Sequence, residues 1–160
     1  MLSDAEKIHL FERMCKSIPF AVSNNIKVEQ VCGDEVTIRL PYRPELVGNP
    51  EAGEVHSSAM TALMDHILGV ACLCCDKADN TVSVTLDLRI DHLGTVPAGN
   101  DILATARVFK VTRRVLFVEG FAYWDSRDNP VVKASGAWML VPGLSLEDLI
   151  SAADTGARQQ

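Results

Sequence analysis

Asp65 is the residue whose type and surroundings best suit chemistry. It lies within the apolar run ALMDHILGVACL, and an ionised carboxylate buried without partners would cost several kcal/mol. Steps of three and four residues along a helix place small or polar residues in one stripe, namely Ser58, Thr61, Ala62, Asp65, Gly69 and Cys72. Such a stripe leaves room for a ligand or another chain. The alternative is an Asp exposed at an open sheet edge or paired with an Arg.

A second candidate group stands just before this segment. His56, Ser57 and Ser58 lie where the predicted helix begins, and free backbone N–H groups at a helix N-terminus suit a developing oxyanion. Ser57 or Ser58 could instead be the N-cap residue, and His56 could simply hold the loop through a hydrogen bond. Both interpretations stay open on the sequence alone.

Several other classes of protein are disfavoured. The chain has no GxSxG nucleophile elbow, no P-loop and no GxGxxG pattern. Its four His and five Cys show no metal-ligand spacing, so we expect neither a metal site nor a bound cofactor. A net charge of −6 argues against binding to nucleic acid or anionic membranes. We see no signal peptide and no charge-free membrane span, and therefore expect a cytoplasmic protein with reduced thiols.

The predicted elements must hold these residues in place. Helical spacing predicts an amphipathic helix over about 4–17, capped by Ser3 and Glu6, and a long helix of about 18 residues from Ser57 to Cys75. Alternation predicts a hairpin before a loop at 43–55, and four strands after the long helix, the first over 82–90. A last helix is expected near 146–152. The order favours an α+β fold in which an antiparallel sheet curves around the long helix, as one domain over 1–160.

The segment NPEAGEVHSSAMTALMDHILG, residues 49–69, resembles the signature of hotdog-fold thioesterases related to the phenylacetic-acid-degradation enzyme. In that family a loop of the form NPxGxxHGG leads into the central helix, and an Asp follows nine residues after the His, as Asp65 follows His56. The likeness covers about residues 22–141. It implies the hotdog fold, subunits paired edge to edge into a homodimer, dimers associated into tetramers, and active sites between subunits.

The resemblance also implies roles for individual residues. Asp65 would be the nucleophile or the general base for water, Asn49 and the Ser57 N–H would stabilise the oxyanion, and His56 would hold the loop. Ser83 would help to position the water from the partner subunit. The chain departs from the family where Ser57 and Ser58 replace two glycines, so the Ser58 side chain would border the substrate site.

The implied substrate is an acyl-CoA, whose phosphates need cationic partners. Arg113 and Arg114, in a turn between strands, resemble the basic pair that meets the CoA nucleotide in relatives, and Arg89 is a further candidate. The expected activity is hydrolysis of an aliphatic or aryl acyl-CoA to a free acid and CoA. The alternative is a hotdog protein that binds or senses acyl-CoA without catalysis.

Overall fold

The computed structural model describes residues 3–156. The chain begins with two helices, α1 (Asp4–Ser17) and α2 (Pro19–Ser23), followed by a hairpin of β1 (Lys27–Cys32) and β2 (Glu35–Leu40). The predicted capping box is present, since the Glu6 N–H donates to Ser3 Oγ and the Ser3 N–H donates to the Glu6 carboxylate. The first helix and the hairpin are therefore confirmed at the expected places.

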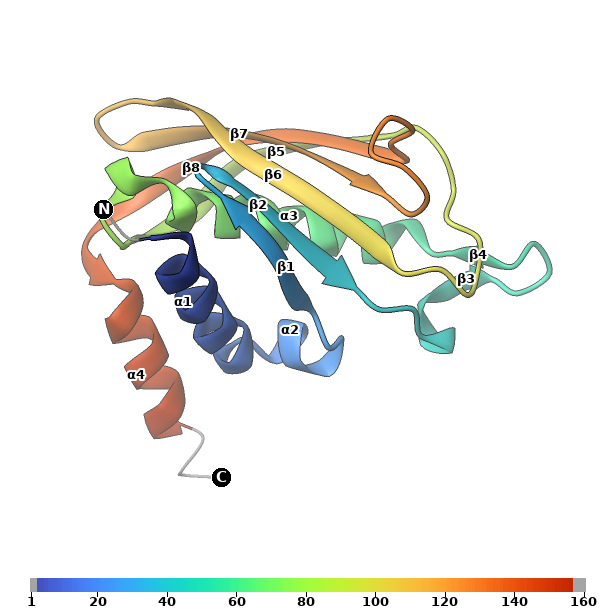
Figure 1. The fold of residues 1–160 in the computed structure, drawn as a ribbon, viewed down its shortest axis with the longest axis horizontal. Helices are drawn as coiled ribbons and strands as arrows, with labels where there is room; N and C mark the ends of the chain where they lie inside the picture. Colours follow the sequence, from blue (N-terminus) through green and yellow to red (C-terminus); the bar gives the residue numbers. More distant parts are fainter. Residues whose placement is uncertain (1–2, 157–160) are drawn as a thin grey trace.

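The segment predicted as an irregular loop contains short regular elements. A 3₁₀ turn, η1 (Pro44–Leu46), precedes a small antiparallel ribbon of β3 (Val47–Asn49) and β4 (Glu54–Val55). This ribbon projects from one end of the molecule and leads into the first turn of α3 (Ser57–Cys74) (Figure 1). The loop is thus ordered by its own backbone pairing.

The remaining elements complete the sheet. After α3 and the 3₁₀ turn η2 (Asp76–Ala78) come four strands and a C-terminal helix, with bounds β5 (Thr81–His92), β6 (Ile102–Val111), β7 (Val115–Tyr123), β8 (Val132–Ser145) and α4 (Leu146–Gly156). Across the described residues, six strands form one antiparallel sheet in the order β1-β2-β6-β7-β8-β5. This is the predicted architecture, and β5 lies at an open edge.

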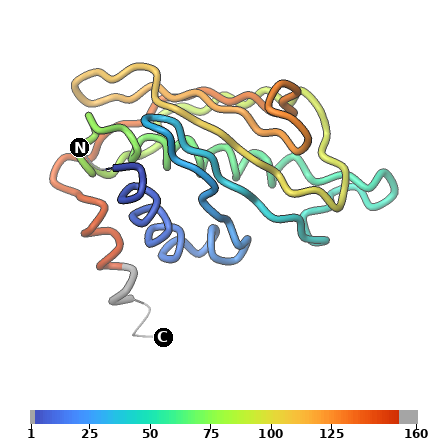
Figure 2. The backbone as a smooth tube through the Cα atoms, viewed as in Figure 1, coloured from blue at the N-terminus to red at the C-terminus, as the bar shows by residue number. Residues whose placement is uncertain are grey.

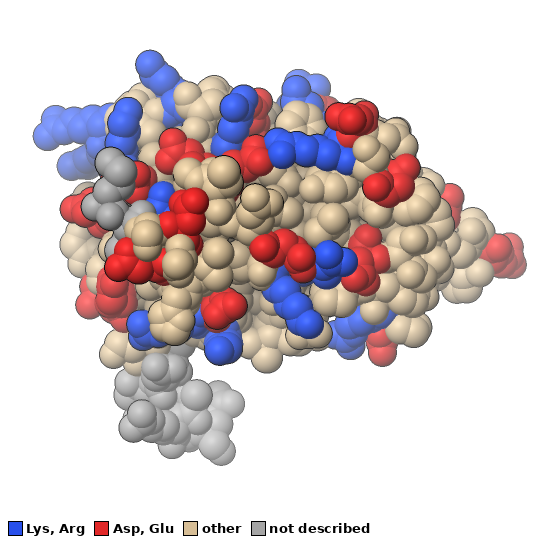
Figure 3. All heavy atoms as spheres, in the orientation of Figure 1, with Lys and Arg blue, Asp and Glu red and all other residues tan. Residues whose placement is uncertain are grey.

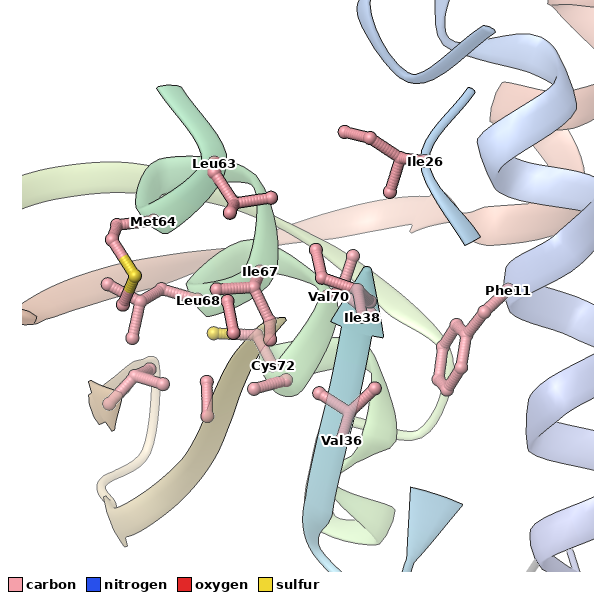
Figure 4. Packing of buried hydrophobic residues seen from close by; sticks show 14 of the residues in the cluster. Phe11, Ile26, Val36, Ile38, Leu63, Met64, Ile67, Leu68, Val70 and Cys72 are labelled. Carbon is pink, nitrogen blue, oxygen red and sulfur yellow. The ribbon is translucent and has the colours of Figure 1, made fainter. Parts of the chain in front are cut away.

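The curved sheet packs around α3, which contacts β2, β5, β6, β7 and β8 (Figures 1 and 2). Leu63, Met64, Ile67 and Leu68 of α3 are fully buried. Figure 4 shows the α3 side chains facing Val36 and Ile38 of β2. By length and composition α3 could also span a bilayer, but the core helix of a globular protein has the same properties, and half of α3 is buried here.

The strand β5 departs from the simple alternation that its sequence suggests. Its pairing with β8 shifts between Thr85 and Asp87, which inserts an extra residue into β5. Such a bulge changes which residues face the helix. Ser83 and Thr85 face α3 before the bulge, whereas Leu88 and Ile90 pack against the core after it. Polar side chains of β5 thereby reach the middle of α3.

Candidate active site

The carboxylate of Asp65 lies in the middle of α3 and is exposed in the single chain. The expectation that the sheet would cover it was therefore wrong, and the alternative of an open sheet edge holds. The physical reason is that β5, the strand nearest to this side of α3, has no neighbour on its outer side. Thr85 of β5 donates a hydrogen bond from Oγ1 to Asp65 Oδ1 at 3.1 Å.

A cavity of about 240 Å³ opens beside Asp65. Its polar lining comes from Asp65, His66, Ser83 and Thr85, on α3 and β5. The rest of the lining is Gly69 together with apolar side chains from α1, the residue between α1 and α2, α3, β5, β8 and α4, namely Met14, Ile18, Val70, Leu73, Val82, Trp138, Leu146 and Leu149. The arrangement therefore joins one exposed carboxylate to an apolar chamber.

His66 follows Asp65 in the chain and lines the same cavity, but its ring packs against Cys15 and Phe20. Its Nε2 lies 3.9 Å from Cys15 Sγ, and its ring meets Phe20 edge-on. Burial lowers the pKa of His66, against the opposing effect of Asp65, and burial raises the pKa of the Cys15 thiol to about 11, with a further contribution from Glu12. Both groups are thus neutral near pH 7, so the thiol is not an activated nucleophile.

At the other end of α3, His56 is itself the N-cap residue. Its Nδ1 accepts the Ser58 N–H at 3.0 Å and lies 2.7 Å from Ser58 Oγ. The interpretation of Ser57 or Ser58 as the cap was therefore wrong, because the imidazole occupies that position. The His56 N–H donates to the Leu46 carbonyl at 2.7 Å, so His56 also ties the preceding loop to the helix.

Two further features shape this N-terminus. A Cβ at Gly48 would come within 2.5 Å of the His56 ring, so only glycine allows this close packing of the loop. In the part of the chain that the structure describes, the Ser57 N–H makes no hydrogen bond. A free N–H in the first turn of a helix is a donor available to an anion.

Asn49 holds its own loop in the single chain. Its Oδ1 accepts the Ala52 N–H at 3.2 Å, and its carbonyl accepts the Gly53 N–H at 2.8 Å. Asn49, His56 and Ser57 line a second cavity of about 340 Å³, which Asp65 does not line. Asp65 follows Ser57 by eight positions along the helix, a rise of about 12 Å. One chain therefore does not bring these predicted site residues together.

Ser83 lies in the same cavity as Asp65 of its own chain. The resemblance implies that Ser83 helps to position the water from the partner subunit, and that role stays a prediction. The Ser83 hydroxyl oxygen is buried and has no partner at hydrogen-bonding distance, although it is near enough to the Cys72 thiol to interact with it. A sulfur atom is a weak partner, which leaves this hydroxyl available to another group.

The three predicted phosphate-binding arginines are in different states. Arg113 and Arg114 are exposed in the turn between β6 and β7, and neither forms an ion pair within residues 3–156. Lys and Arg side chains gather at this end of the molecule, opposite the β3–β4 ribbon (Figures 1 and 3). Arg89 instead pairs with Asp91 at 3.0 Å, so the β6–β7 turn is the freer cationic site.

Residues 3–156 contain no group of three His, Cys, Asp or Glu side chains that could hold a metal ion. The five cysteines are free thiols, and only Cys32 is exposed. Burial raises the pKa of Cys72 to about 12. The ionisable groups at the cavity therefore reduce to the carboxylate of Asp65 and the neutral His66.

Comparison with known proteins agrees with this architecture. The family model of the thioesterase superfamily matches residues 52–128, which include the whole of α3. A crystal structure of a Pseudomonas aeruginosa protein is 33% identical over 84% of this chain and 99% of its own, with a TM-score of 0.76. The chain belongs to the thioesterase superfamily. Among curated proteins, no sequence matches this one.

More distant solved structures share the fold of this superfamily member. The PaaI protein of the Escherichia coli phenylacetic acid degradation operon is 17% identical, with a TM-score of 0.76 over 89% of this chain and 99% of its own. A thioesterase from Haemophilus influenzae is 19% identical, with a TM-score of 0.70 over 84% of this chain and 90% of its own. These structures confirm the predicted hotdog fold, and the family model confirms the relationship to thioesterases.

Thr85 is the residue that the sequence interpretation of this thioesterase-superfamily chain missed. Alternation along β5 marked Thr85 only as one of several polar residues between apolar ones, and the bulge that turns it toward α3 leaves no clear sequence signature. The stripe of small and polar residues around Asp65 on α3 was the sequence feature that pointed to a polar neighbour. A carboxylate there needs a donor, and the donor comes from the strand beside it.

Proposed function

We propose that this protein is an acyl-CoA thioesterase that converts a small aliphatic or aryl acyl-CoA to the free acid and CoA. The observation that carries the proposal is the position of the Asp65 carboxylate, which is exposed, oriented by Thr85 and adjacent to an apolar cavity. An acyl group in the cavity would hold its thioester carbonyl near the carboxylate. Acyl-CoA metabolism and the free cysteines fit a reducing compartment, so we further propose a cytoplasmic location.

Two chemical routes are open to Asp65. As a general base it would take a proton from water while the water oxygen bonds to the carbonyl carbon. As a nucleophile its carboxylate oxygen would bond to that carbon, expel the CoA thiolate and leave an anhydride for water to cleave. Either route places negative charge on the carbonyl oxygen. The free Ser57 N–H at the N-terminus of α3 is the donor that we assign to that oxygen.

A complete site of this kind requires two copies of the chain. Asp65 and the N-terminus of α3 lie about 12 Å apart along one helix, and their cavities are separate. We propose a homodimer in which the open β5 edges pair antiparallel. In such a pair the two-fold axis is perpendicular to the strands, so it reverses the long direction of the second molecule. It would bring the loop of Asn49, His56 and Ser57 from one subunit toward Asp65 of the other.

The same antiparallel arrangement of the two subunits would also supply a binding site for the nucleotide of CoA. Arg113 and Arg114 lie at the end of the molecule opposite the β3–β4 ribbon (Figure 1). In an antiparallel pair, this basic end of one subunit approaches the ribbon end of its partner. We assign the nucleotide phosphates of CoA to these two arginines, with Arg89 as a weaker contact because Asp91 already neutralises it.

The decisive variant is Asp65→Asn, assayed for release of free thiol from a panel of short, medium and aryl acyl-CoAs. We expect turnover to fall by about 10²–10⁴-fold, since the amide can neither accept the proton nor attack the carbonyl. Because Asp65 is exposed, the melting temperature should change little. Asp128→Asn, in the exposed β7–β8 turn, is the matched control and should keep full activity. Retained turnover in Asp65→Asn would refute the assignment.

A specific observation favours a second candidate, a non-catalytic acyl-CoA-binding protein. Two serines stand where the family signature that this sequence resembles has glycines, and Ser58 Oγ lies against His56 Nδ1 at the entrance to α3. These side chains narrow the region where we place the thioester. Calorimetry with S-alkyl-CoA thioethers would distinguish the candidates. Tight binding by a wild-type protein that releases no thiol from any acyl-CoA in the panel would favour the binding protein.

A further inference from the structure

The cavity beside Asp65 follows the axis of α3 toward the C-terminal end of that helix. Asp65, Gly69 and Leu73 all line it and succeed one another at intervals of four residues, which is about 6 Å per step. The cavity therefore extends about 12 Å beyond the carboxylate. Most of its lining is aliphatic or aromatic, including Met14 of α1, Ile18 just after α1, and Leu146 and Leu149 of α4, and the Ser83 hydroxyl near Cys72 is a polar group in this part.

We propose that this cavity is the acyl subsite, that α4 closes it, and that Gly69 and Leu149 set the longest acyl group that the enzyme accepts. The inference rests on the proposed function and adds the substrate class. A volume of about 240 Å³ corresponds to about eight molecules of liquid water. From this volume we expect the subsite to favour short and medium-length acyl groups, or a single aromatic ring, over long fatty acyl chains.

The position of α4 is fixed well enough to act as a wall. Its first turn is capped by Ser145, whose Oγ accepts the Asp148 N–H at 3.1 Å, and the Leu146 N–H donates to the Asn80 carbonyl at 2.9 Å. Leu146 and Ile150 are buried and fasten the helix to the rest of the protein. Leu149, between them, is half-buried and lines the cavity.

Gly69 keeps the middle of the cavity open. A glycine inside a helix is less favourable than alanine, so its presence here has no advantage for the helix itself. A Cβ at this position would meet Trp138 Nε1 at 3.6 Å, which is ordinary van der Waals contact. An alanine is therefore accommodated without strain, and its methyl group would occupy space between Asp65 and the far wall.

These features allow stability and specificity to be separated by experiment. We would measure kcat/KM for acetyl-, butanoyl-, hexanoyl-, octanoyl-, dodecanoyl- and palmitoyl-CoA. For wild type we expect a maximum at hexanoyl or octanoyl and a steep fall at dodecanoyl. Gly69→Ala should raise Tm by about 2 °C while reducing the octanoyl-to-butanoyl ratio about tenfold. Loss of activity through misfolding would lower Tm instead.

Two substitutions on α4 form a matched pair. Leu149→Ala removes a side chain from the cavity wall and should raise the dodecanoyl-to-octanoyl ratio about tenfold. Ile150→Ala removes a similar side chain that is buried but does not line the cavity, so it should lower Tm without changing the ratio. If Leu149→Ala and Gly69→Ala both keep the wild-type chain-length profile, the proposed subsite is wrong, even though hydrolysis itself stands.

Binding provides a readout that does not depend on turnover. The same variants would be titrated with S-butyl-, S-octyl- and S-dodecyl-CoA thioethers. One outcome is that wild type hydrolyses no acyl-CoA while Gly69→Ala and Leu149→Ala still change the dependence of Kd on chain length in the directions expected for kcat/KM. In that case the proposed activity fails and the subsite stands. A Kd profile that is the same in wild type and both variants overturns the subsite.

Discussion

Thr85 is the residue that orients the Asp65 carboxylate, and its hydroxyl can be removed with little change in shape. Thr85→Val eliminates the 3.1 Å hydrogen bond to Oδ1. We expect kcat to fall by about ten- to a hundredfold with KM nearly unchanged, because the bond positions a catalytic group and does not hold the substrate. Thr85→Ser restores the donor and should recover most of the loss.

The comparison of these two variants decides the role of the hydroxyl. A purely structural contribution of Thr85 would lower the melting temperature in proportion to the loss of activity. If Thr85→Val and Thr85→Ser both turn over like wild type, Thr85 does not position Asp65.

The sequence identified some site residues and missed others for physical reasons. Asp65 and His56 could be picked out as candidates because an acidic residue is unusual in an apolar helix and because the spacing of nine residues resembles a family signature, although Asp65 proves to be exposed rather than buried. The role of His56 as the N-cap could not be predicted, because serine is the commoner N-cap residue. The imidazole accepts the Ser58 N–H in a position that depends on the close packing of Gly48 against the ring. Residue type alone does not define such packing.

At the scale of the elements, the pairing of β5 with β8 determines whether Thr85 reaches α3. Gly136 of β8 pairs with Leu88 next to the bulge, and a Cβ there would collide with the Asp87 carbonyl and lie 2.8 Å from the Trp138 ring. Gly136→Ala should therefore push β5 away from the sheet. We expect a loss of about 1–3 kcal/mol in the free energy of unfolding.

Urea denaturation measures this loss directly. Ser135→Ala, one residue earlier in the same strand, serves as the control and should change stability by less than about 0.5 kcal/mol. Activity of the folded Gly136→Ala protein should also fall, because Thr85 moves with β5. A Gly136→Ala protein with the stability of wild type would show that the strand accommodates the methyl group.

The elements themselves could be predicted well, since helical and alternating hydrophobic patterns record burial directly. The bounds of α1 and the start of α3 agree with the expected ranges to within a residue. Prediction failed where backbone pairing decides the outcome, as in the bulge of β5 and the short ribbon of β3 and β4. A bulge depends on how a strand pairs with its neighbour, and the hydrophobic pattern of one strand does not show which strand that neighbour is.

At the scale of the whole molecule, the open edge of β5 leaves both hydrogen-bonding groups and apolar side chains uncovered. Val84 and Leu86 of β5 are 44% and 54% exposed, and Met139 pairs opposite Val84 on β8. A long exposed edge strand with apolar residues invites pairing with another chain. The sequence could not show which strand forms the edge, because strand order is a property of the folded sheet.

Pairing of the β5 edges predicts that Leu86, near the middle of the strand, lies close to the two-fold axis. Light scattering of wild type should therefore give a mass of two or four chains of 17.4 kDa. Leu86→Lys would place like charges near each other across the axis, which should shift the protein toward a single chain and reduce thioesterase activity in parallel. Val22→Lys alters an equally exposed side chain on α2, remote from β5 in sequence, and should leave both mass and activity unchanged.

A wild-type protein of one-chain mass with full activity would contradict the shared site, as would a Leu86→Lys monomer that hydrolyses acyl-CoA at the wild-type rate. In either case Asp65 would have to work with groups of its own chain, and the Ser57 N–H, about 12 Å away along α3, could not be its oxyanion donor.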